Sequence, residues 1–89
     1  SQSQNYPNPF NPSTVIKYAI PPNNKGGIVS TKITVFDILG RKVATLVDKV
    51  QKAGNYEVKF DATGLSSGIY FCRLRSGIYS KSIKMILVR

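Results

Sequence analysis

The sequence of 89 residues contains no histidine. Histidine is the usual general base near neutral pH and the commonest metal ligand, so its absence removes both roles. Only four side chains are acidic, and Asp37, Asp48, Glu57 and Asp61 do not cluster by spacing. No zinc-type ligand spacing or calcium loop of the EF-hand type is present. We therefore expect a protein that is not an enzyme and that needs no metal or cofactor.

Cysteine and long apolar runs are also scarce. Cys72 is the single cysteine, so no internal disulfide can form, and we expect a small buried apolar side chain there. The longest apolar stretch, residues 85–88, has the length of a strand, so no membrane span is expected. There is no initiating Met and no secretory signal peptide. These features favour a piece of a larger protein or a processed product, with residues 1–4 as linker or leftover expression sequence.

Basic side chains, in contrast, are abundant. Thirteen basic against four acidic residues give a net charge of +9, which favours acidic partners such as nucleic acid, anionic lipid or acidic polysaccharide. The alternative is a solvated basic surface. Four lysines alternate with apolar residues and are expected to face solvent, where they discourage edge-to-edge aggregation: Lys17, Lys32, Lys59 and Lys84.

Nucleic-acid binding needs aromatic side chains beside basic ones on one surface. Most aromatic residues fall in the apolar phase of their strands and are expected in the core. Outward phases are shared only by Phe36 with Lys32, and by Phe71 with Arg73 and Arg75. We therefore do not expect a nucleic acid as partner.

Apolar and polar residues alternate along short stretches, as in half-buried strands. Strands are predicted at residues 14–20, 28–37, 42–47, 56–60, 69–75 and 79–88. Turns are predicted at residues 21–27, 37–40 and 76–77 (Ser76-Gly77), and Gly40 accommodates the positive φ of the second turn. A polar connection is predicted at residues 49–55, and residues 61–68 are predicted to cross between strands. A helix at 38–50 is the one rival, but Gly40 and a β-branched run oppose it. Strands spaced about 8–12 residues apart predict an all-β sandwich or barrel.

Tyr70 favours the sandwich. In Greek-key sandwiches a tyrosine near the start of the penultimate strand sends its hydroxyl back to the backbone a few residues upstream. The order Leu65, Gly68, Tyr70 fits that arrangement, and Cys72 follows two residues later, as in immunoglobulin domains. The alternative for Tyr70 is an ordinary core aromatic.

Five motifs then occur in order along the chain. They are Asn5 to Thr14 (NYPNPFNPST), Val35 to Arg41 (VFDILGR), Gly54 to Tyr56 (GNY), Leu65 to Tyr70 (LSSGIY) and Lys84 to Arg89 (KMILVR). Over residues 5–89 the chain resembles the C-terminal sorting domain of cargo proteins of type IX (Por) secretion. The resemblance implies an immunoglobulin-like antiparallel β-sandwich of about seven strands with Greek-key connections.

The resemblance also implies a function and partners. Such a domain is a folded address that is recognised in the periplasm of Bacteroidota-like bacteria and guides an upstream cargo domain through the outer-membrane translocon. Its partners are the type IX translocon and shuttle proteins. A sortase-like peptidase at the cell surface often removes it, and the cargo becomes extracellular or is attached to a surface lipopolysaccharide.

The resemblance assigns motif roles to ten residues: Pro7, Asn8, Pro9, Gly54, Tyr56, Gly68, Tyr70, Lys81, Lys84 and Arg89. The prolines fix an extended leading segment that cannot pair as a central strand, although they would serve equally in a stiff spacer. The terminal strand from Lys81 to Arg89 is predicted to present its edge or its charges to a receptor. Plain solubility is the alternative for these charges.

Two other functions compete with sorting. A structural immunoglobulin-like spacer would stay attached to the mature protein. A glycan-binding module would carry solvent-exposed aromatic side chains on one sheet face.

Overall fold

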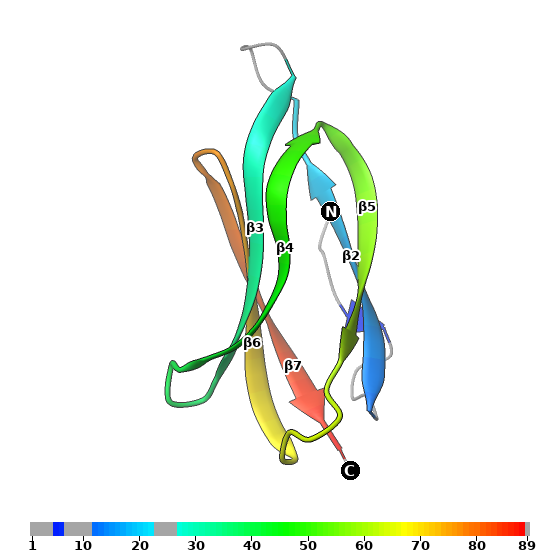
Figure 1. Ribbon diagram of the computed structural model, residues 1–89, viewed down its shortest axis with the longest axis vertical. Helices are drawn as coiled ribbons and strands as arrows, with labels where there is room; N and C mark the ends of the chain where they lie inside the picture. Colours follow the sequence, from blue (N-terminus) through cyan, green and yellow to red (C-terminus); the bar gives the residue numbers. More distant parts are fainter. Residues whose placement is uncertain (1–4, 7–11, 23–26, 89) are drawn as a thin grey trace.

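The computed structural model describes residues 5–6, 12–22 and 27–88. The described residues contain no helix and form seven strands, shown in Figure 1. The strands are β1 (Asn5–Tyr6), β2 (Ser13–Ile20), β3 (Ile28–Asp37), β4 (Lys42–Lys52), β5 (Gly54–Asp61), β6 (Gly68–Ser76) and β7 (Tyr79–Leu87). The predicted all-β class is confirmed.

The strands form two antiparallel sheets that pack as a sandwich (Figure 1). One sheet has the order β1-β2-β5, and the other has the order β4-β3-β6-β7. Hairpins join β3 to β4 and β6 to β7, whereas the chain crosses between the sheets after β2, β4 and β5. Because β2 pairs with β5 and β3 with β6, strands distant in sequence lie side by side. This is the immunoglobulin-like, Greek-key arrangement that the sequence predicts.

The core lies between the sheets and follows from the alternation of each strand. Ile16, Tyr18 and Ile20 of β2 are buried, and so are the alternate apolar residues of β3, β6 and β7 that face them. Cys72 is 3 % exposed, and burial raises its pKa to about 12. It is therefore the buried apolar side chain that we predicted. The principal extents of the molecule are 43 × 23 × 18 Å.

Three predicted boundaries are wrong. Strand β4 continues to Lys52, so the expected polar connection at 49–55 shrinks to Ala53 between β4 and β5. Val50 and Gln51 still pair with β3. Since β4 is an edge strand, its polar residues meet solvent without leaving the ladder. Likewise, the turn between β6 and β7 is Gly77–Ile78 rather than Ser76-Gly77, because Ser76 still pairs with Tyr79.

Strand β4 departs from simple alternation at two points. Its pairing with β3 skips one residue between Val47 and Thr45, and another between Ala44 and Lys42. The skipped residues are bulges. As a result Lys42, Thr45 and Asp48 are exposed. The apolar pairs between them, Val43-Ala44 and Leu46-Val47, are partly or fully buried. Over residues 42–48 the outward residues of β4 therefore recur every third position instead of every second.

Candidate recognition surfaces

The two Gly-x-Tyr motifs have the same geometry. Gly54 and Gly68 open β5 and β6, and each has φ at 151°, in a region that residues with a Cβ rarely adopt. Two residues later the Tyr56 hydroxyl donates to the Lys52 carbonyl at 2.6 Å, and the Tyr70 hydroxyl donates to the Ser66 carbonyl at 2.7 Å. The hydrogen bond predicted for Tyr70 is confirmed. We call these two units the tyrosine corners.

Both tyrosine corners lie where the chain has just crossed from one sheet to the other. Each hydroxyl reaches back four residues and ties the new strand to the segment before it. Tyr56 also stacks on its cross-strand partner Tyr18, with 5.4 Å between ring centroids, and the Tyr18 hydroxyl donates to Gln51 on the opposite sheet. The geometry therefore gives these motif residues a role in building the sandwich.

The terminal strand β7 is an edge of the four-stranded sheet. Lys81 is the Cα partner of Leu74 and lies in the inward-facing row, where it is partly buried beside Ile33 and Tyr18. Lys84 is the partner of Phe71 and is exposed on the outer face. The two lysines therefore lie on opposite faces of one strand. Arg89 and the motif Pro7 to Pro9 fall outside the described residues.

An inward-facing lysine on an edge strand discourages the pairing of a further strand. The row that contains Lys81 is otherwise apolar, with Ile33 of β3 and Leu74 of β6. The position of Lys81 is thus one that natural sheets use to protect an edge.

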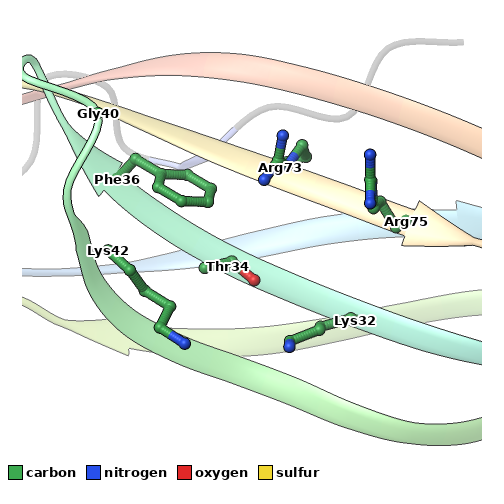
Figure 2. A pocket seen from close by; sticks show the side chains of 7 residues that line it. All are labelled: Lys32, Thr34, Phe36, Gly40, Lys42, Arg73 and Arg75. Atoms are coloured by element: carbon green, nitrogen blue, oxygen red, sulfur yellow. The ribbon is translucent and has the colours of Figure 1, made fainter.

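The outer face of the four-stranded sheet carries an open hollow of about 370 Å³, shown in Figure 2. Four of its lining residues are cationic and none is acidic. The lining residues are Lys32, Thr34 and Phe36 of β3, Gly40 of the turn between β3 and β4, Lys42 at the start of β4, and Arg73 and Arg75 of β6. We call this site the basic hollow.

Contacts between neighbouring strands organise the basic hollow. The Arg73 guanidinium lies 4.6 Å from the centroid of the Phe36 ring, a cation–π arrangement that orients its N–H groups. Thr34 is only 6 % exposed and is the Cα partner of Arg73 on the adjacent strand. Lys32 and Arg75 are Cα partners on adjacent strands. The bulges of β4 make Lys42 the partner of Phe36, and paired residues share a face, so Lys42 joins the hollow as well.

The turn between β3 and β4 lies at one end of the hollow. The Asp37 carboxylate accepts the Leu39 and Arg41 backbone N–H groups, both at 2.9 Å, and pairs with Arg41 Nε at 2.8 Å. These bonds, led by the one from the Arg41 backbone N–H, lower the pKa of Asp37. The turn is tightly braced, yet Ile38 and Leu39 are 66 % and 73 % exposed. We call these two residues the apolar tip.

Sequence reasoning did not find the basic hollow or the apolar tip. One signal was present, because Phe36 and Lys32 share an outward phase, as do Phe71, Arg73 and Arg75. What was missing is the pairing of β3 with β6, which merges the two groups on one face. For the tip, the available signal was a pair of large apolar residues in a stretch already assigned to a turn.

The described part of the chain offers no centre for metal chemistry. Within residues 5–6, 12–22 and 27–88 no three His, Cys, Asp or Glu side chains are grouped to hold an ion. The same residues include no helix that is long and apolar enough to cross a membrane.

No curated protein matched the chain. The family model of the secretion system C-terminal sorting domain (Por_Secre_tail) matches residues 4–89, so nearly the whole sandwich is covered. That family consists of sorting signals of type IX secretion rather than enzymes. The chain therefore belongs to the family of secretion system C-terminal sorting domains.

Proposed function

We propose that residues 5–89 act as a folded sorting signal that takes an upstream cargo domain across the outer membrane through the type IX translocon. In this proposal residues 1–4 are linker or leftover expression sequence. The family match over residues 4–89 carries this proposal, and the closed sandwich supports it, because a folded signal displays its surfaces in a fixed arrangement. In this proposal shuttle proteins receive the domain, and a sortase-like peptidase removes it at the cell surface.

The test is a fusion of residues 1–89 to a periplasmic reporter, expressed in a host with a working type IX system. We expect the reporter outside the cell, and we expect it to stay in the periplasm when the translocon is deleted. Retention in the intact host would contradict the sorting role.

Processing is tested with the same fusion. We expect the exported reporter to be lighter by the mass of the sorting domain, because the peptidase cuts at or before its first residues. Export of a reporter with the domain still attached would contradict removal. It would favour a domain that stays on the mature protein as a structural spacer.

A further inference from the structure

We propose that the sorting machinery reads the outer face of the four-stranded sheet, and that the reading partner is a protein surface that presents carboxylates to the basic hollow and an apolar pocket to the apolar tip. This inference rests on the proposed function and adds to it the face that is read and the chemistry of its reader. The residues that carry it are Lys32, Phe36, Lys42, Arg73 and Arg75, together with the tip.

The charge of the hollow favours a negatively charged partner. Lys32 and Arg75 are direct cross-strand partners, and like charges placed opposite one another destabilise a sheet. Lys42 adds a third exposed cation to the same hollow. The like charges of Lys32, Lys42 and Arg75 repel one another, and a ligand with carboxylates would offset that repulsion.

The geometry indicates a built site rather than scattered surface lysines. Arg73 is held over Phe36, so its planar N–H groups are oriented before a ligand arrives, as bidentate recognition of a carboxylate requires. The two irregularities of the β3–β4 ladder occur beside Thr34 and Phe36. Bulges commonly redirect side chains near functional sites, and here they bring Lys42 onto the outer face.

The apolar tip decides between a protein and a polyanion. Ile38 and Leu39 protrude from a turn fixed by Asp37 and Arg41, so their docking would cost little ordering entropy. The fully buried core of a protein–protein interface is more apolar than the rest of the protein surface, and arginine is enriched in such interfaces. An acidic polysaccharide or a nucleic acid would use the charges but would leave the tip in water.

The first experiment reverses charge on two faces of the reporter fusion. Lys42→Glu with Arg75→Glu alters the hollow, and Lys17→Glu with Lys59→Glu is the matched control, since these exposed lysines lie on the three-stranded sheet. Both variants lose the same net charge. We expect export to fall about tenfold or more for the hollow variant and to stay near the parent level for the control.

The second experiment replaces the tip with polar residues. Ile38→Ser with Leu39→Ser is compared with Ile78→Ser, which alters a fully exposed residue in the turn at the other end of the sandwich (Figure 1). We expect the tip variant to lose export and the control to keep it. Cooperative thermal unfolding of each variant verifies that the domain is folded.

The outcomes separate the two proposals. If the unaltered fusion stays in the periplasm, the sorting role itself fails. If the unaltered fusion is exported and the hollow variant is exported equally well, the sorting role stands and the reading face is wrong. Equal losses in the hollow variant and its control would mean that net charge, not this face, is read. Loss in the hollow variant with normal export of the tip variant would identify a polyanion as the ligand and overturn the protein partner.

Discussion

Tyr56 and Tyr70 make the same hydrogen bond in different surroundings. The Tyr70 ring is 6 % exposed, whereas the bond of Tyr56 lies at the surface. We expect Tyr70→Phe to lower the free energy of unfolding by about 1 kcal/mol, because the bond is lost and the Ser66 carbonyl loses its donor. Tyr56→Phe should cost less, since water can replace the hydroxyl. Urea unfolding measures both values, and a larger cost for Tyr56→Phe would contradict the comparison.

Cys72 gives a second test at the level of single residues. Burial raises the pKa of its thiol to about 12, and the side chain is 3 % exposed, so both ionisation and access are restricted. We expect no reaction with a thiol reagent at pH 8 in the native protein and one equivalent in strong denaturant. Fast labelling of the native protein would show that the sandwich opens around β6 more readily than its packing implies.

At the level of elements, the turn between β3 and β4 should be sensitive to acid. Hydrogen bonds, first from the Arg41 backbone N–H, lower the pKa of Asp37 below its ordinary 3.8. A lowered carboxyl pKa in the folded state stabilises the fold above the ordinary value, and this contribution disappears as the pH falls through the lowered value. We expect Asp37→Ala to lower the Tm at pH 7 and to have little effect near about pH 2.

The matched control for this turn is Asp37→Asn. Its amide oxygen can still accept the Leu39 and Arg41 N–H groups, but it cannot form the ion pair and does not titrate. We expect an intermediate Tm at pH 7. A Tm difference between the parent and Asp37→Ala that stays constant from pH 7 to about pH 2 would rule out the carboxylate as its source.

The strands also show how far the sequence predicts this molecule. Alternation places β2, β3, β6 and β7 within a residue or so, because each has one buried face. It fails in β4, where two bulges produce a three-residue repeat. That repeat explains why a helix competed for residues 38–50. Tyr70 could be predicted from its place in the penultimate strand, whereas the basic hollow could not, because it needs the register of three strands at once.

At the scale of the whole molecule, the fold depends on β7, whatever part this strand has in recognition. Met85 and Leu87 are fully buried, and truncations of core side chains of this size to alanine cost about 2–5 kcal/mol each. We expect deletion of residues 81–89 to abolish cooperative unfolding, as followed by circular dichroism during heating. Lys84→Glu should unfold cooperatively, because Lys84 is exposed. A cooperative transition in the truncated chain would show that the sandwich closes without its terminal strand.

The comparison between these two variants matters for export. Loss of export by the truncation would report only that the fold is gone. Loss of export by a folded Lys84→Glu variant would report recognition, because the core is intact. The predicted role of the terminal charges is therefore tested by point substitution rather than by deletion.

The slender outline of the sandwich has a consequence for transport. Its extents of 43 × 23 × 18 Å mean that lengthwise travel presents a cross-section of 23 by 18 Å. A conduit that passes the domain in its folded form must therefore be wider than 23 Å at its narrowest point. A narrower conduit would admit only the unfolded chain. The β2–β5 and β3–β6 strand pairs would then have to separate at its entrance.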